Sequence, residues 1–228
     1  MQTVRSVFFG KYCQNSRIPE PIEWIVLQKT DRELLLLSRY CLEIISYAGY
    51  DCYGKYNGGI RHLLWEYSYL REWLNGTFYR DAFSAREKRL IRTTLIQSIV
   101  NKEGLPEDFE NKVFILSRQE AETFLTTPEL RRGNLTRHAR NDPETSSLDD
   151  VPWWILPEVD MSAGICSMEA ICHGKEVTEE ASFFPYPQAV CAQGPHYHSR
   201  NIYHRDWTVR PAIRIRRTGR LLPAPIKL

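Results

Sequence analysis

The sequence predicts an α+β fold with a mainly antiparallel sheet. Short apolar segments of strand length gather near both ends of the chain, and short helices with recognisable caps lie between them. Strands and helices do not alternate as βαβ units, and the chain contains no glycine-rich phosphate loop. These observations argue against a Rossmann-type or P-loop nucleotide site.

Length and composition favour one folded domain. The chain has 228 residues, of which 43% are apolar and 12% aromatic, enough for a hydrophobic core. We expect a single domain over residues 1–217 and a C-terminal tail over residues 218–228. No apolar run reaches the ~18 residues of a membrane helix, and the first ten residues do not read as a signal peptide. We therefore expect a soluble cytoplasmic protein without membrane contacts, whose six cysteines are thiols.

The first part of the chain predicts three strands. Val4–Tyr12 and Ile22–Gln28 are separated by polar residues and prolines that are typical of a turn. Glu33–Ser38 contains four consecutive leucines, a pattern that fits a strand covered on both faces. Trp24 and Leu37 would then belong to neighbouring, paired strands.

The segment Trp65–Asn75 predicts a short helix with a wide aromatic face. Ser68 can cap a helix by accepting a hydrogen bond from a free backbone N–H group. One turn then separates Tyr69 from Trp73 and Leu70 from Leu74. Asn75-Gly76 tolerates the left-handed conformation found at many helix ends, so we expect the helix to stop there.

Two capping boxes predict further helices. Ser84 with Glu87, and Ser117 with Glu120, can each satisfy the partner's free backbone donor at a helix start. Between and after these helices, the expected strands are Val113–Leu116, Pro152–Leu156 and Trp207–Arg216. Ser162–Tyr203 reads as irregular and loop-rich.

A set of short motifs resembles a bacterial domain family of unknown function, over about residues 7–215. The motifs are Phe9-Gly10-Lys11-Tyr12, Ile22–Leu27, Leu35–Ser38, Trp65–Asn75, Ala82-Phe83-Ser84, Val113–Ser117 with Glu120, Leu135-Thr136 with Ala139, Trp153-Trp154 and Val209-Arg210-Pro211-Ala212. The resemblance extends to C-type-lectin-like folds, with sulfatase-modifying-factor domains among the relatives. It implies a small twisted sheet, two or three short helices and a long loop-rich C-terminal region that carries the ligand surface. The family's Arg and Ser-Pro after the Trp-Trp pair are replaced here by Ile155-Leu156-Pro157, which puts a family site there in doubt.

Aromatic residues in the C-terminal part suggest ligand binding. Aromatic rings near amide side chains suit the recognition of a sugar, a peptide or a protein surface. Our first hypothesis is a non-catalytic recognition domain that binds an unknown protein, peptide or glycan through residues 141–204. The candidate ligand-binding residues are Trp153, Trp154, Phe184, Tyr186, Tyr197 and Tyr203.

A metal-binding protein or metalloenzyme is the second hypothesis. Cys191, His196, His198 and His204 lie within fourteen residues, and Cys and neutral His are zinc ligands. Their spacing matches no common zinc motif, and the carboxylates of Asp149, Asp150, Glu158 and Asp160 form no recognisable calcium loop. We predict no cofactor, with zinc or calcium as the alternatives.

Other enzyme chemistry finds less support in the sequence. The paired cysteines that copper-dependent sulfatase-modifying enzymes need are not visible near the chain end. His138 or His173 could act as a base for a Ser or Cys nucleophile, but no Gly-x-Ser-x-Gly elbow is present. The sequence therefore favours a protein that is not an enzyme.

The charge distribution gives the third hypothesis, a polyanion-binding module. Residues 142–180 contain ten acidic residues and one Lys, whereas residues 200–228 contain eight basic residues and one Asp. Arg214, Arg216 and Arg217 could bind a nucleic acid or another polyanion. The alternative is that these charges are neutralised inside the fold, and the strand-like alternation with Ile213 and Ile215 favours it over nucleic-acid binding.

The family motif itself is interpreted as a folding signature. We expect Trp65 and Trp73 to pack on the sheet without touching a ligand, and Arg71 or Arg210 to be buried against Glu66 or Glu120, because a buried guanidinium needs a partner. The residues assigned to this structural motif are Trp65, Glu66, Ser68, Leu70, Arg71, Trp73, Leu74, Asn75, Arg210 and Pro211.

Overall fold

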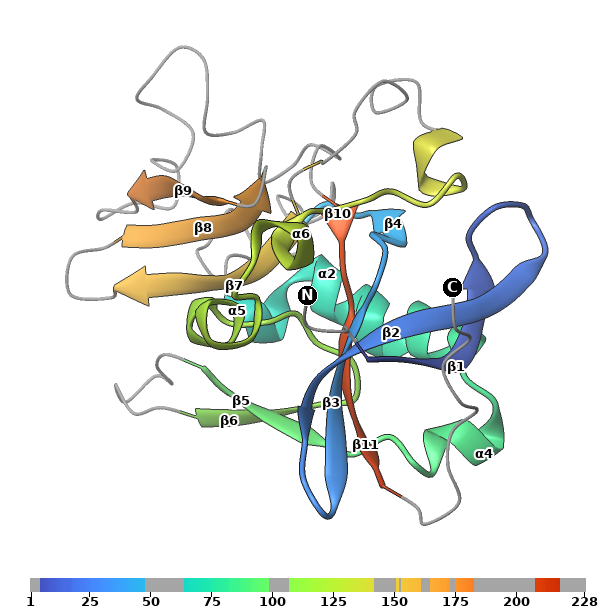
Figure 1. The fold of residues 1–228 in the computed structure, drawn as a ribbon. Helices are drawn as coiled ribbons and strands as arrows, with labels where there is room; N and C mark the ends of the chain where they lie inside the picture. The colour runs from blue at the N-terminus through green and yellow to red at the C-terminus, as the bar shows by residue number, and fades with distance from the viewer. Residues whose placement is uncertain are drawn as a thin grey trace.

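The computed structural model has a mixed α+β fold with a curled, mainly antiparallel sheet and few helices, as the sequence predicts (Figure 1). It describes residues 5–47, 64–98, 107–141, 151, 153–160, 165–172, 175–182 and 208–217. Within these residues, no helix is long and apolar enough to cross a membrane.

The first sheet has four antiparallel strands in the order β1-β2-β3-β11. Its strands are β1 (Ser6–Cys13), β2 (Pro19–Lys29), β3 (Glu33–Ser38) and β11 (Ala212–Arg216). Trp24 lies opposite Ser38 and Ile25 opposite Leu37, so the expected pairing of the second and third strands is confirmed. Leu35, Leu36 and Leu37 are buried, as expected for a strand covered on both faces.

The second sheet has five strands in the order β4-β10-β7-β8-β9. Its strands are β4 (Glu43–Ile44), β10 (Thr208–Val209), β7 (Trp153–Asp160), β8 (Ile165–Cys172) and β9 (Lys175–Ser182). The pairing of β10 with β7 is parallel and the other pairings are antiparallel. The prediction of irregular structure over residues 162–203 is wrong for β8 and β9, which form an antiparallel hairpin over eight residue pairs.

The chain passes between the two sheets twice. After β3 in the first sheet it enters the second sheet as β4, and after β10 in the second sheet it returns to the first as β11. The expected single strand over residues 207–216 is therefore broken at Arg210-Pro211, where proline lacks the N–H group that a ladder would need. Figure 1 shows β10 and β11 following one another along one line.

The aromatic motif forms a chain of short helical turns rather than one helix. It comprises the 3₁₀ turn η2 (Trp65–Tyr67), α2 (Tyr69–Trp73), the π-helical turn η3 (Leu74–Phe78) and α3 (Tyr79–Ala82). Ser68 caps α2 by accepting from the backbone N–H group of Arg71 at 3.1 Å, as predicted. The prediction that the helix ends at Asn75-Gly76 is wrong, because η3 and then α3 continue the helical segment to Ala82.

Both predicted capping boxes are present. Ser84 and Glu87 open α4 (Ala85–Lys88), and Ser117 and Glu120 open α5 (Arg118–Phe124). A further short helix, α6 (Pro128–Arg131), and the 3₁₀ turn η4 (Ala139–Asn141) follow. A separate hairpin pairs β5 (Thr94–Ser98) with β6 (Glu107–Asn111).

One hydrophobic core joins these elements. It includes Trp24, Phe78 and Ile213, together with Trp65 and Trp73, which are 6% and 9% exposed. The burial expected for these two motif tryptophans is therefore confirmed. Residues 113–116 are also buried but form only a single bridge, from Phe114 to Ala212, instead of the predicted strand.

Candidate functional site

Tyr12, Glu43 and His138 form a hydrogen-bonded group of three polar side chains. The phenol of Tyr12 donates to Glu43 Oε1 at 2.9 Å, and the imidazole Nε2 of His138 lies 3.1 Å from the same oxygen. The side chains of His138 and Glu43 are 33% and 22% exposed. The three residues thus place an oriented imidazole and a carboxylate at the edge of the core.

The backbone fixes each member of this group. Tyr12 lies on β1, and Glu43 lies on β4, where it is the register partner of Val209 on β10. The backbone N–H group of His138 donates to the carbonyl of Gln14 at 2.7 Å. Three segments that are distant in sequence therefore meet here.

Aromatic packing and charge keep Tyr12 in its protonated form. Its ring packs against Phe78 at a centroid distance of 5.2 Å and against Trp73 at 6.4 Å. Burial, together with the neighbouring charge of Glu43 and the hydrogen bond to it, raises the pKa of Tyr12 well above its ordinary value. The phenol therefore remains a hydrogen-bond donor to Glu43 throughout the physiological pH range.

The motif residues near α2 are bound inside the fold through Asn111. Asn111 is 1% exposed, and its side-chain oxygen accepts from Trp65 Nε1 at 3.2 Å and from Arg71 Nε at 2.8 Å. Arg71 also donates to the carbonyls of Glu66 and Glu110. No local sequence pattern marks Asn111, because its partners lie 40 and 46 positions away.

Asn75 connects the same helical segment to the chain after β6. Its side-chain oxygen accepts from the backbone N–H groups of Lys112 at 2.7 Å and Val113 at 3.2 Å. Its amide donates to the carbonyls of Arg71 and Val113. Asn75 thus acts as a bridge between two segments, and not as the helix terminator that the sequence suggested.

Arg210 is buried as expected, but its partners are different. It is 1% exposed, and its guanidinium donates to the carbonyls of Ser38, Leu130 and Arg132 at 3.1, 2.8 and 3.4 Å. Burial lowers the pKa of Arg210 to about 10, so it is still charged at neutral pH. Within the described chain its hydrogen bonds go to backbone carbonyls, and the expected pairing of Arg210 with Glu66 or Glu120 is not seen.

The two tryptophans proposed for ligand binding lie in the core. Trp153 and Trp154 are fully buried, and their indole N–H groups donate to the carbonyls of Arg131 and Ile45 at 2.8 and 2.9 Å. Their ligand role stays a prediction. The other candidates lie outside the described residues: Phe184, Tyr186, Cys191, His196, Tyr197, His198, Tyr203 and His204. Among the residues that the structure does describe, no group of three or more His, Cys, Asp or Glu side chains could hold a metal ion.

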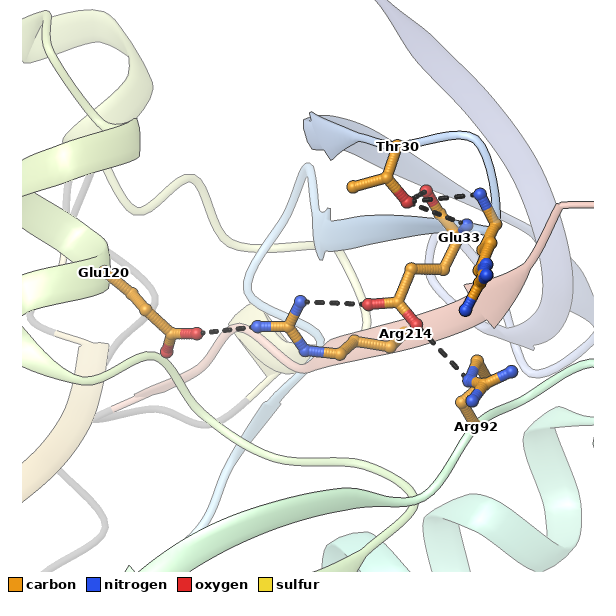
Figure 2. A network of polar contacts seen from close by, with 6 residues as sticks. Thr30, Glu33, Arg92, Glu120 and Arg214 are labelled. Carbon is orange, nitrogen blue, oxygen red and sulfur yellow. Dashed lines mark hydrogen bonds and ion pairs between the residues drawn. The ribbon is translucent and has the colours of Figure 1, made fainter.

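The basic end of the chain is partly neutralised by acidic residues from elsewhere in the fold. Arg214 lies between two carboxylates, with Glu120 at 3.1 Å and Glu33 at 3.5 Å, and Glu33 also contacts Arg92 at 3.3 Å (Figure 2). Arg217 approaches Asp31 at 3.8 Å. These carboxylates lie outside the acidic segment 142–180 that the sequence suggested as the counter-charge.

Comparison with known proteins identifies a domain family of unknown function. No curated protein and no solved structure matches the chain. Residues 31–217 match the domain of unknown function DUF6273. Because this match covers most of the sequence, the chain belongs to the DUF6273 family.

Proposed function

We propose that this domain is a non-catalytic recognition module whose ligand surface is formed by residues 141–204. One observation carries the proposal: the polar groups of the family motif are used inside the fold. Trp65 and Arg71 donate to Asn111, Asn75 binds the backbone at residues 112–113, and Arg210 binds three carbonyls. A motif whose polar groups are already satisfied specifies a fold, and ligand contacts are then left to the loops.

A C-type-lectin-like fold in the broad sense is part of this proposal. Small sheets, a few short helices and one continuous core support it. A cytoplasmic location is also proposed, and it is supported by Cys13, whose thiol donates to the carbonyl of Arg17.

The proposal can be tested with the full chain on an oligosaccharide array and a short-peptide array. We expect Tyr186→Ala and Tyr197→Ala to weaken binding to the retained oligosaccharide or peptide by about tenfold, at an unchanged melting temperature. Tyr69→Ala is the matched control, because Tyr69 is 44% exposed on the motif helix.

Three results would contradict the proposal. The first is the absence of any retained array component. The second is chemical conversion of the bound molecule, detected by mass spectrometry. The third is loss of binding on Trp73→Ala without a fall in melting temperature, which would move the site to the helix face.

A further inference from the structure

The β5–β6 hairpin has a strand edge that is open within the described part of the chain. β5 (Thr94–Ser98) pairs with β6 on one side and forms no backbone hydrogen bond with any other described segment. In an antiparallel ladder, alternate residues turn their N–H and C=O groups toward the partner strand, and the residues between them turn theirs away. The outer side of β5 therefore offers a row of backbone donors and acceptors to another strand.

The described hydrogen bonds that hold the hairpin to the rest of the domain lie on β6. Arg71 Nη2 donates to the carbonyl of Glu110 at 3.0 Å, and Trp65 and Arg71 both donate to the side chain of Asn111. Figure 1 shows the two strands extending away from β11. β6 thus anchors the hairpin, and β5 is left as its accessible strand.

β5 lacks the features that usually protect an edge strand from pairing with another chain. Such strands carry a proline, a charged residue or a bulge. β5 contains no proline and no charged residue, and its register with β6 has no shift. Leu95 is 59% exposed, whereas Ile96 beside it packs against the core. A third strand would cover Leu95 and stabilise the hairpin, since an isolated two-stranded hairpin is marginally stable.

The face of the hairpin that carries Leu95 is acidic. Glu110 lies opposite Leu95, Asp108 lies opposite Gln97, and all four residues are exposed. Among the described residues, neither Asp108 nor Glu110 forms an ion pair. An exposed apolar side chain is therefore flanked by two carboxylates that have no described counter-charge.

The cations near the hairpin are engaged elsewhere. The guanidinium of Arg71 is bonded to β6 as described above and lies over the Phe109 ring at 6.0 Å. Arg92 contacts Glu33 at 3.3 Å, and the ammonium of Lys112 donates to a threonine hydroxyl just before β5 at 2.7 Å. A cation that approaches Asp108 and Glu110 thus meets carboxylates still free to attract it.

We propose that an extended, cationic segment of a partner protein adds to β5 as a third strand. The open edge requires an extended segment, because only a strand can pair with alternate backbone groups along it. Charge selects the partner: a strand beside β5 lies about 10 Å from β6, a gap that long Lys or Arg side chains can bridge toward Asp108 and Glu110. A second copy of this chain fits less well, because it brings the same acidic strand toward this face.

The test uses the full chain and an acetylated, amidated octapeptide in which lysine and valine alternate. Binding is measured by titration calorimetry at about 50 mM and about 200 mM salt. We expect the peptide to bind, and binding to weaken at the higher salt because exposed charges contribute to it.

Two control peptides separate strand addition from simple charge attraction. The same sequence with N-methylated backbone amides keeps its charge but cannot donate to the strand edge, and it should bind at least about tenfold more weakly. The same peptide with glutamate in place of lysine should not bind, because its charges repel those of Asp108 and Glu110.

Matched variants locate the binding edge. Leu95→Lys should weaken binding by about tenfold or more, because it removes the apolar contact and repels the cationic peptide. Ile18→Lys is its control, since Ile18 is 73% exposed in the segment between β1 and β2, and it should bind like the parent. Both substituted side chains are exposed, so both variants should keep the melting temperature of the parent.

A second pair of variants tests the charges. Asp108→Asn combined with Glu110→Gln should weaken binding and reduce its salt dependence. The control is Glu122→Gln combined with Glu129→Gln, the same loss of charge at exposed positions of α5 and α6, and it should leave binding unchanged.

The proposal is overturned if the alternating peptide does not bind at the lower salt, if the N-methylated peptide binds equally well, or if Leu95→Lys binds like the parent. A chain that sediments as a dimer, and that Leu95→Lys converts to a monomer, would assign the edge to a second copy and also overturn it. Because β5 lies outside residues 141–204, either result would leave the proposed aromatic ligand surface untouched, and the array experiment tests that surface separately.

Discussion

The guanidinium of Arg210 lies 4.8 Å from the centre of the Trp153 ring, so that a buried cation rests on a buried aromatic face. Arg210 belongs to the break between β10 and β11, and Trp153 begins β7. The same guanidinium binds the carbonyl of Ser38 at the end of β3. Through its contacts with Trp153 and Ser38, Arg210 links the two sheets at the point where the chain passes between them.

Replacing Arg210 by Lys should destabilise the domain by about 2–4 kcal/mol. Lys keeps the charge but cannot reach three carbonyls in a fixed fork or stack flat on an indole, so buried acceptors lose their donors. Urea unfolding of the full chain measures the change. Arg216→Lys, at an exposed position, is the control and should stay within about 0.5 kcal/mol of the parent. Equal stabilities of the two variants would refute this role for Arg210.

Asn111→Ala should cost about 2–3 kcal/mol, because it leaves the buried donors of Trp65 and Arg71 without their acceptor. Asn111→Asp keeps both acceptor contacts and loses only the donation to the Phe109 carbonyl, so it should cost less. Chemical denaturation gives both values. An Asp variant as unstable as the Ala variant would show that the acceptor oxygen is not what matters.

Two glycines should respond to alanine in opposite directions. Gly10 has φ +68°, and an added Cβ would lie 2.7 Å from the Phe83 ring and 2.8 Å from the Ala82 carbonyl. Gly10→Ala should therefore destabilise the domain by about 2–4 kcal/mol. A Cβ at Gly76 would meet nothing within 4 Å, so Gly76→Ala should stabilise by about 0.5–1 kcal/mol. Thermal unfolding of both variants checks the contrast, which would fail if they shifted the melting temperature alike.

Glu87 should make stability depend on pH in the acid range. Burial opposes its charge, but hydrogen bonds from the side chain and backbone of Ser84 and from the backbone of Gly10 outweigh burial and lower the pKa of Glu87. A carboxylate with a lowered folded-state pKa stabilises the fold fully above its unfolded pKa, about 4.3. That contribution is lost as the pH falls through the lower, folded-state pKa.

The matching variant is Glu87→Gln. It should lower the free energy of unfolding at pH 7 by about 1–2 kcal/mol and reduce the fall in stability between about pH 5 and pH 3. The measurement is denaturant unfolding at several pH values. An unchanged acid dependence in Glu87→Gln would assign that dependence to other carboxylates.

Local signals in the sequence predicted local structure well. The strand Glu33–Ser38 has the predicted bounds, and both capping boxes form as expected. These features depend on residues only a few positions apart. The aromatic motif was predicted less well, because Asn75 is used by residues 112–113 and not by its own helix end.

Features set by distant residues could not be read from the sequence. The carboxylate of Glu43 and the imidazole of His138 are 95 positions apart, so His138 could be considered as a base but not placed beside its partner. Burial of Arg71 or Arg210 was predicted from their positions in the motifs, and Arg210 is 1% exposed. Its three carbonyl partners could not be predicted, because every residue has a backbone carbonyl whatever its side chain.

The pairing of β2 with β3 extends the first sheet to residues before the family match. The family match starts at residue 31, yet β1 and β2 lie before it and supply half of the four-stranded sheet. Trp24, on β2, is fully buried, and its indole donates to the carbonyl of Phe9. A chain cut at residue 31 would leave the leucine-rich β3 as an unprotected edge, inviting aggregation. The four-stranded sheet therefore includes residues that precede the family match in this chain.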